Sequence, residues 1–508
     1  MRFFAVAALT LCASAEILAA DMTWREKAQR DLAATRVAIE DSHPGAADVD
    51  NPGFRAWLYD GYFKALAQVA KVRDYGGYAA VLRYYVNGFH DVHMSVKTTG
   101  GPKPRTPGFL TKLSHGEFVV ANRMNLESRT PPIGSTLLSC DGKSAMMVAH
   151  DVLDPYFTIT QLNAHRWMSA PFLFVDDHNP FVGLPRACKF RVPNDDNPRE
   201  FTLEWREISI GALDNGVNGI LDWSPNMGVR KVGNSMYWVT LPAMGAPFDS
   251  PQYQDLISDV HDQADALRAS EVVVIDVRSN SGGRAEWGTA IANAIWGQEY
   301  VRSHASDATL DMRVSATTVA FISTPASRKA EEGYARLENW DPLDVDSLRS
   351  AYDAKRPWIS FPVYPGTQND RDRKAPNPVR AKVVLLTDTW CVSACLMFVD
   401  LVFDMGETLH VGLPTNADTM YTGVRKQTLE TDNATLTMPT EVFRRRKRAA
   451  NQTYVPKHIW HGEVSDTYAI EHWVRELPEL QKHSNLAVEE ARQSREAITR
   501  SQTRVRKR

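Results

Sequence analysis

The chain has 508 residues, which is enough for three or four domains of ordinary size. Hydrophobic residues make up 43% of it and charged residues 23%, the proportions of a folded globular protein, which excludes a disordered, collagen-like or coiled-coil chain. The net charge of -3 provides no overall positive field. The composition therefore argues against a nucleic-acid-binding protein.

Residues 1–20 have the pattern of a secretory signal peptide. Arg2 precedes an apolar run, Phe3–Cys12, and the small residues Ala13–Ala15 follow as a cleavage site, with a second possible site after Ala19 or Ala20. No other apolar run reaches the length of a membrane-spanning helix. We therefore expect an exported protein, periplasmic or secreted, without a transmembrane anchor.

Four cysteines remain after cleavage, and an exported protein can form disulfides. We expect Cys140 to pair with Cys188, since both lie in strand-like segments of one region, although two buried free thiols fit equally well. Cys391 and Cys395 have three interpretations: small apolar packing, a metal site, or a disulfide. The metal site lacks a second Cys/His pair at suitable spacing.

The expected elements divide the rest of the chain into four regions. Residues 21–98 have helical periodicity, and 99–210 contain short strand-like runs such as 116–121, 135–140 and 201–205. In 211–480, strands expected at 236–241, 272–277 and 383–386 alternate with helices at 252–267, 286–296 and 394–405, the last closed by Gly406. Such alternation predicts α/β layering. Residues 481–508 read as a polar, basic tail.

Two segments have the form strand, tight turn, helix. The first runs from Val272 to Gly283, where paired glycines let the backbone approach a ligand, although the segment also fits a plain turn. The second places Ser393 at the sharp entry to an apolar helix. A serine there presents its hydroxyl beside amides that can bind an oxyanion, although serine is also a common helix N-cap.

Three blocks of sequence occur in the order of a known family. They are Asp91–Met94 (DVHM), Ile275–Gly283 (IDVRSNSGG), and Thr389–Ala394 (TWCVSA) followed by Val411–Thr415 (VGLPT). Together they resemble the C-terminal processing (tail-specific) serine peptidases and their tricorn-core relatives. The resemblance covers roughly residues 37–474.

The resemblance implies an α/β (α+β) fold, with a crotonase-like peptidase core at 211–480 and an N-terminal helical region. It also implies a PDZ-like β domain at 99–210, around Gly134–Gly142, that would bind an extended peptide by strand addition. No lysine follows Thr415 closely, and Lys426 is too distant for a Ser-Lys dyad. The Ser-His branch of the family therefore remains, with Ser393 as nucleophile.

His93 is the general base that this resemblance implies, and His90 is its competitor. The resemblance further assigns the oxyanion hole to the backbone amides of Gly282 or Gly283 and of Ala394. The residue that orients the histidine is expected downstream of the serine, where Glu441 and Gln452 are equal candidates. No metal or organic cofactor is expected.

The sequence thus predicts an exported serine-type endopeptidase that hydrolyses peptide or protein substrates; it leaves the oligomeric state open. Two alternatives remain: a non-catalytic peptide- or lipid-binding protein on the same fold, and a Ser-His esterase. The basic run Arg444–Arg448 is interpreted as a solvated face, with an acidic polymer, lipid headgroups or peptide carboxylates as other possible contacts.

Overall fold

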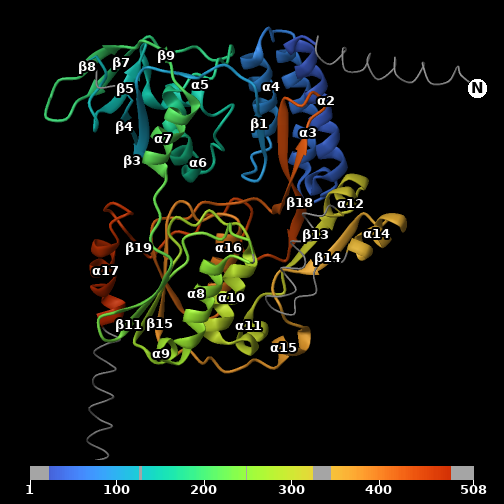
Figure 1. The fold of residues 1–508 in the computed structure, drawn as a ribbon, viewed down its shortest axis with the longest axis vertical. Coiled ribbons are helices and arrows are strands. Elements are labelled where there is room, and N and C mark those ends of the chain that lie inside the picture. The colour runs from blue at the N-terminus through green and yellow to red at the C-terminus, as the bar shows by residue number, and fades with distance from the viewer. Residues whose placement is uncertain (1–21, 125–128, 248, 324–344, 482–508) are drawn as a thin grey trace, which may run out of the picture.

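The computed structural model describes residues 22–124, 129–247, 249–323 and 345–481. The expected signal peptide lies outside these ranges, as does the expected tail apart from Gln481. Within them the chain is a mixed α/β protein, which confirms the predicted fold class (Figure 1). None of the described helices combines the length and the apolar character needed to cross a membrane.

A six-stranded sheet forms the centre of the C-terminal half. Its spatial order is β10 (Gly228–Val232), β11 (Met236–Thr240), β12 (Val272–Asp276), β15 (Lys382–Thr387), β16 (Thr408–Gly412), β19 (His458–Ile459). Neighbouring strands run parallel, except that β10 is antiparallel to β11. Parallel strands end at one edge of a sheet, where ligands bind in such folds. The turns that follow β12 and β15 therefore meet at that edge.

Helices cover both faces of this sheet (Figure 1). On one face Val273 packs in a core with Leu396, and on the other Val274 packs with Ile470. Burial on both faces explains why β12 is a continuous apolar run rather than an alternating one. The first face carries α8 (Pro251–Asp262), α9 (Ala264–Ala269), α10 (Ala285–Trp296), α11 (Gln298–His304) and α16 (Ala394–Asp404). The second carries α17 (Thr467–Arg475).

An antiparallel sheet combines strands that are far apart in the sequence. It contains β1 (Ser95–Thr98), β18 (Ala434–Arg444), β13 (Thr309–Arg313) and β14 (Trp358–Pro362), with β17 (Tyr421–Thr428) also paired to β18. Its core includes the N-terminal helices α2 (Trp24–Ser42), α3 (Pro52–Val69) and α4 (Tyr75–Asn87). Because β1 pairs with β18, the turn just before β1 lies beside residues more than 300 positions later.

A third sheet occupies the region expected to be PDZ-like. Its strands are β3 (Phe109–Ser114), β4 (Glu117–Arg123), β5 (Thr136–Cys140), β7 (Ala187–Arg191) and β8 (Arg199–Thr202), with β6 (Lys143–Ser144) paired to β5. Its helices are α5 (Ala145–Val152), α6 (Asn163–Ser169) and the 3-10 helix η2 (Ala170–Phe174). A short pair, β2 (Arg105–Thr106) with β9 (Arg206–Glu207), closes the region where the chain enters and leaves it. We call residues 105–207 the sheet domain.

The remaining elements connect these parts. They are η1 (Pro44–Ala46), α7 (Ile210–Leu221), α12 (Ala316–Ile322), α14 (Val345–Asp353) and α15 (Gln368–Asp372). Two expected elements differ from the structure. The helix expected at 252–267 is divided into α8 and α9, and the strand expected at 201–205 ends at Thr202. Beyond Thr202 the Leu203 amide still donates to the Arg186 carbonyl oxygen (2.8 Å), and the Trp205 indole N–H donates to the Pro185 carbonyl oxygen (3.0 Å).

Cys140 and Cys188 form a disulfide, which confirms the preferred pairing. The two residues lie directly opposite each other in β5 and β7, and both are buried. The bond therefore fastens the middle of the sheet domain.

Replacing Cys140 and Cys188 by alanine is expected to lower the free energy of unfolding. The sequence separation is 48 residues. Loop-closure entropy for that length corresponds to about 4 kcal/mol. The midpoint of urea unfolding measures this effect. The matched control is Cys391→Ala with Cys395→Ala, where the separation is only 4 residues, so that about 2 kcal/mol is expected. A larger loss in the control would contradict the argument.

Candidate active site

Ser393 lies at the junction between strand β15 and helix α16. It is the N-cap residue of α16, with φ 58° and ψ -124°. This left-handed backbone conformation costs a residue other than glycine about 1–3 kcal/mol, and such strain is concentrated at functional sites. The junction has the strand-turn-helix geometry of a nucleophile elbow. The structure thus places Ser393 in a strained turn at the carboxyl edge of the parallel sheet.

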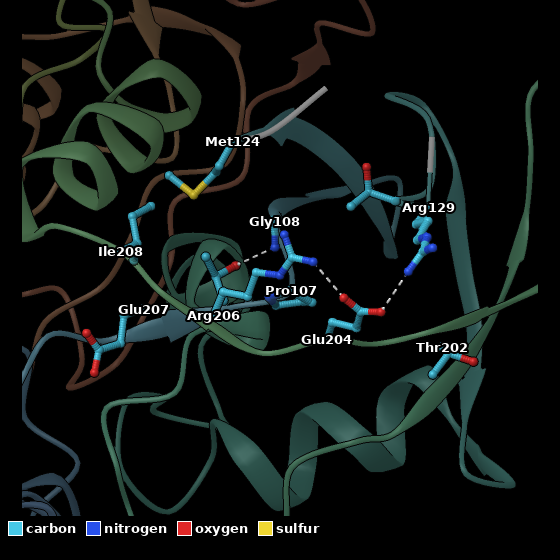
Figure 2. Close-up of a pocket in the computed structure, with 11 residues that line it drawn as sticks. Pro107, Gly108, Met124, Arg129, Thr202, Glu204, Arg206, Glu207 and Ile208 are labelled. Atoms are coloured by element: carbon cyan, nitrogen blue, oxygen red, sulfur yellow. Dashed lines mark hydrogen bonds and ion pairs between the residues drawn. The ribbon is translucent and has the colours of Figure 1, made fainter. Parts of the chain in front are cut away.

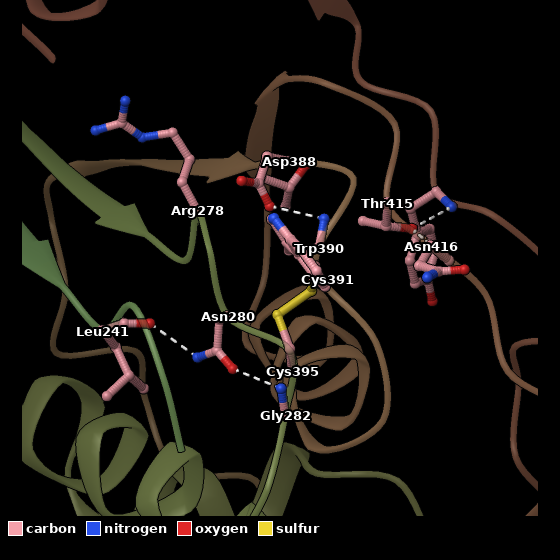
Figure 3. The surroundings of a disulfide bond; sticks show 12 residues. Leu241, Arg278, Asn280, Gly282, Asp388, Trp390, Cys391, Cys395, Thr415 and Asn416 are labelled. Carbon is pink, nitrogen blue, oxygen red and sulfur yellow. Dashed lines mark hydrogen bonds between the residues drawn. A yellow bond between two sulfur atoms is a disulfide. The ribbon is translucent and has the colours of Figure 1, made fainter. Parts of the chain in front are cut away.

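A disulfide joins Cys391 and Cys395 (Figure 3), the residues two positions before and after Ser393 in the sequence. The two sulfur atoms are bonded to each other, so the disulfide is the interpretation that the structure supports, and both cysteines are fully buried. The Cys391 carbonyl oxygen accepts a hydrogen bond from the Asn416 amide (3.1 Å). The Ser393 turn is therefore fixed by the disulfide and by the hydrogen bond from Asn416, which lies in the segment after β16.

The turn after β12 contacts the Ser393 turn directly. Gly282 has φ +88°, and a Cβ atom built there would lie 2.9 Å from both the Ser393 Cβ and the Ala394 amide nitrogen. Asp388 joins the two turns, since its carboxylate accepts hydrogen bonds from the amides of Ser279 (2.8 Å) and Trp390 (3.0 Å). Burial raises the pKa of Asp388 to about 7, although these hydrogen bonds oppose the shift.

The Gly282 amide already has a partner. It donates to Asn280 Oδ1 (2.9 Å), whose side-chain amide donates in turn to the Leu241 carbonyl oxygen (2.8 Å) (Figure 3). Of the three amides expected in the oxyanion hole, those of Gly283 and Ala394 are therefore the better candidates. Gly282 has no side chain, which lets the turn after β12 lie close to Ser393 and Ala394.

Asp276 and Arg278 form a buried ion pair below this turn. Arg278 has no exposed surface, and its Nε lies 2.9 Å from one Asp276 oxygen and its Nη2 2.6 Å from the other. The guanidinium also donates to the Val464 carbonyl oxygen (2.8 Å) and to Thr467 Oγ1 (3.1 Å). The Asp276–Arg278 pair therefore connects the start of the turn after β12 to the segment at Val464 and Thr467.

His93 lies in the turn between α4 and β1. Its amide donates to Asp91 Oδ1 (2.8 Å), and its ring Nδ1 lies 3.6 Å from the same oxygen. Burial lowers the pKa of His93, but the Asp91 carboxylate and, to a smaller extent, Asp418 outweigh it, so that the pKa is raised. The competitor His90 is half-buried, and burial lowers its pKa.

Residues 415–419, here called the connecting segment, join the His93 turn to the Ser393 turn. At one end Asn416 contacts Cys391, as described above. In the middle Ala417 packs with Val92, and at the other end Thr419 Oγ1 donates to Asp91 Oδ2 (2.9 Å). The structure therefore places Ser393, Gly282 and Ala394 in direct contact and links His93 to them through this segment.

Glu441 and Gln452 are the downstream candidates, and Gln452 follows Asn451, whose amide donates to the Asp418 carbonyl oxygen in the connecting segment (2.8 Å). Glu441 is in β18, where its carboxylate faces Gly423 and has Glu286 as its charged neighbour. Burial, followed by the charge of Glu286, raises its pKa to about 7. Gln452 is exposed and accepts a hydrogen bond from the Ala449 amide (2.8 Å).

The interpretation of 444–448 as a solvated face is wrong for Arg446 and Arg448. Their side chains are 4% and 0% exposed, and both form ion pairs with Asp418 in the connecting segment. Arg448 also bonds to Asp400 (Nε to Oδ1 3.1 Å). The sequence showed only a charged run, because the partner carboxylates that permit its burial are distant in the chain.

The sheet domain reaches the site through α6. The Trp167 ring lies edge-on to Trp390 (centroids 5.5 Å apart), and Met168 contacts the Asn416 amide group (3.4 Å). Ile159 and Leu162 pack against Ala417. The connecting segment and the Ser393 turn therefore have the sheet domain as a neighbour.

A cavity of about 190 Å³ lies elsewhere, between β2, β4 and the β8–β9 end of the sheet domain (Figure 2). Glu204 forms ion pairs in it with Arg129 and Arg206, while Met124 and Ile208 form an apolar part. This cavity contains neither Ser393 nor His93.

A known protein family matches the C-terminal half of the chain. The model of peptidase family S41 matches residues 238–459, which include Ser393 and both turns but not His93. A search of curated protein sequences gives no match.

Solved structures are similar over most of the chain. Mature CPAF complexed with lactacystin has 14% identity and a TM-score of 0.59, covering 92% of this chain and 98% of that one. For mature CPAF alone the values are 14%, 0.57, 86% and 93%. The photosystem II D1 C-terminal processing protease has 10% identity, 85% and 92% coverage, and a TM-score of only 0.31. At these identities the likeness to CPAF supports the fold.

Proposed function

The chain belongs to peptidase family S41 through residues 238–459 and is a serine-type peptidase, and from this premise we propose an exported endopeptidase with a Ser393–His93 mechanism. The observation that carries the proposal is the conformation of Ser393. A non-glycine residue at φ 58° between a buried strand and a buried helix, with a glycine against its Cβ, presents its hydroxyl at the sheet edge.

The reaction proceeds through an acyl-enzyme. Ser393 Oγ bonds to the scissile carbonyl carbon while His93 accepts the hydroxyl proton, and the carbonyl electron pair moves to oxygen. The C–N bond then breaks, and His93 returns the proton to the leaving amine. Water repeats the attack with His93 as base and releases the new carboxyl terminus. These steps require no cofactor.

The amides of Gly283 and Ala394 are the proposed donors to the oxyanion. The Ala394 amide stands in the first turn of α16, which has 11 residues, so the positive end of its dipole acts on the same oxygen. Preorganised donors of this kind stabilise the charge that appears in the transition state, because they need no reorientation as it forms.

Export is supported by the signal-like residues 1–20 and by the two disulfides. Disulfides persist in oxidising compartments and are rare in a reducing cytosol. The mature chain is expected to begin between Glu16 and Asp21.

Labelling with a fluorophosphonate tests the proposal. The Ser393 oxygen is expected to displace fluoride from phosphorus, giving one adduct in intact mass, which also reports the mature N-terminus. Ser393→Ala and His93→Ala are expected to give no adduct, whereas Ser465→Ala, at an exposed serine of the same core, labels fully. A folded wild-type protein without an adduct would favour the binding protein. Hydrolysis of small activated esters but not of peptides would favour the esterase.

A further inference from the structure

We propose that Asp91 is the positioning residue of His93, the role for which the sequence offered Glu441 and Gln452. The proposal rests on the function proposed above, since it assumes that His93 is the general base. A serine hydrolase needs such a group, because the neutral imidazole must present the correct nitrogen to the serine and the imidazolium must be stabilised once it forms.

Asp91 and His93 are held together by their own turn. The Asp91 carboxylate accepts the His93 amide at 2.8 Å, so one of its oxygens is fixed in relation to the residue that it would orient. The same oxygen lies 3.6 Å from Nδ1, and the two side chains are only 1% and 9% exposed. A distance of 3.6 Å is longer than a hydrogen bond, but bonds of this kind are often long before substrate binds. In the proposed arrangement Nδ1 donates to Asp91, and Nε2, which is buried and has no hydrogen-bond partner among the described residues, is the nitrogen that accepts the Ser393 proton.

The connecting segment anchors the other carboxylate oxygen. Thr419 Oγ1 donates to Asp91 Oδ2 (2.9 Å) and accepts the Tyr421 amide (3.1 Å), so its hydroxyl is itself oriented. The same segment contacts the Ser393 turn through Asn416. Asp91 is therefore the carboxylate through which the His93 turn and the serine side of the site are fastened together.

Among the histidines near Asp91, His93 is the one that can carry a positive charge at neutral pH. Asp91 has two further histidines among its neighbours, His43 and His165. Burial lowers their pKa values to about 3 and about 4, so both are neutral at physiological pH. Burial raises the pKa of Asp91, but its hydrogen-bond and charge contacts with His93 outweigh that effect, and the pKa is lowered. Asp91 is thus an anion whose cationic partner is His93.

The other acidic groups near His93 are already compensated. Asp418 has two guanidinium partners, Arg446 and Arg448, so less of its charge is left for the imidazolium. Asp48, which faces His43, has its carboxylate paired with Arg444 and the Tyr421 hydroxyl.

The downstream candidates lack these properties. Glu441 lies in β18, and its charged neighbour is Glu286 rather than His93. Gln452 carries no charge and is exposed.

The test is the pH profile of kcat/KM for Asp91→Asn. Asparagine keeps an acceptor for the His93 amide but removes the charge. Because the neutral histidine is the active form, kcat/KM rises with pH through the pKa of His93, which Asp91 raises. The rising limb is therefore expected to move to lower pH, and kcat to fall about 100- to 10,000-fold. The matched control is Asp432→Asn, at an exposed turn. This change is expected to leave both the pH of the rising limb and the value of kcat unchanged.

Other outcomes overturn the proposal. An unmoved limb in a folded Asp91→Asn variant would reject it, as would a shift produced instead by Glu441→Gln or Gln452→Ala. If Asp91→Asn fails to fold, Thr419→Val removes only the anchoring hydroxyl, and an unmoved limb there would count against the role. Wild-type labelling at Ser393 with an unaffected Asp91→Asn enzyme rejects this inference alone, whereas labelling that survives Ser393→Ala rejects the proposed function.

Discussion

The double variant Ser393→Ala/His93→Ala is expected to be no less active than Ser393→Ala alone. Each single change should lower kcat about 10,000- to 1,000,000-fold, and the effects should not multiply, because the two residues move one proton. Without the serine hydroxyl the histidine has no proton to accept, so removing His93 as well does not lower kcat further. The residual rate comes from the oxyanion amides and substrate binding.

A double-mutant cycle on one peptide substrate measures this non-additivity. Thermal unfolding of all four proteins shows whether each variant is folded. Multiplicative effects would mean that Ser393 and His93 act in separate ways, and a single variant within tenfold of wild type would remove that residue from the mechanism.

Gly282→Ala is expected to lower kcat about 100- to 1,000-fold, the usual effect of losing one oxyanion donor. A Cβ there would lie 2.6 Å from the Val392 carbonyl oxygen and 2.9 Å from the Ala394 amide nitrogen. These atoms belong to the backbone and cannot rotate away, so the Ser393 turn must shift. The Ala394 amide would then no longer point at the oxyanion.

Gly142→Ala is the matched control for this change. Gly142 has φ +81°, close to the +88° of Gly282, but its Cβ would meet no atom within 4 Å. It therefore carries the same backbone strain, about 1 kcal/mol of stability, without the collision. Full activity in Gly142→Ala beside a large loss in Gly282→Ala would assign the effect to the Ser393 turn. Equal losses would show that strain alone accounts for it.

Local features of the site could be predicted from the sequence because their causes are local. A buried strand followed by glycines forms a tight turn, and so does a buried strand followed by a serine and an apolar helix. Each turn depends on a few neighbouring residues rather than on the rest of the fold. Ser393, Gly282 and Ala394 were predicted on this ground together with the family resemblance, and the structure brings them into contact. The pairing of Cys140 with Cys188 was predicted from two strand-like segments of one region.

Other features depended on distant parts of the chain. Asp91 is only two residues from His93, yet the reason to single it out is its anchoring by Thr419 and the neutrality of two distant histidines. Arg448 was interpreted as a surface charge because its carboxylate partners, Asp400 and Asp418, lie 30 or more residues away. Nothing in the local pattern showed that the Gly282 amide would be occupied by Asn280.

The sequence by itself therefore determined the α/β class, the two strand-turn-helix segments and the serine at the second of them. These follow from hydrophobic periodicity and turn chemistry, which act over a few residues. The tertiary structure alone decided which carboxylate and guanidinium groups lie around the His93 turn and the connecting segment. Pairing β1 with β18 brings together two segments more than 300 residues apart in the sequence, and burial there sets which groups carry charge.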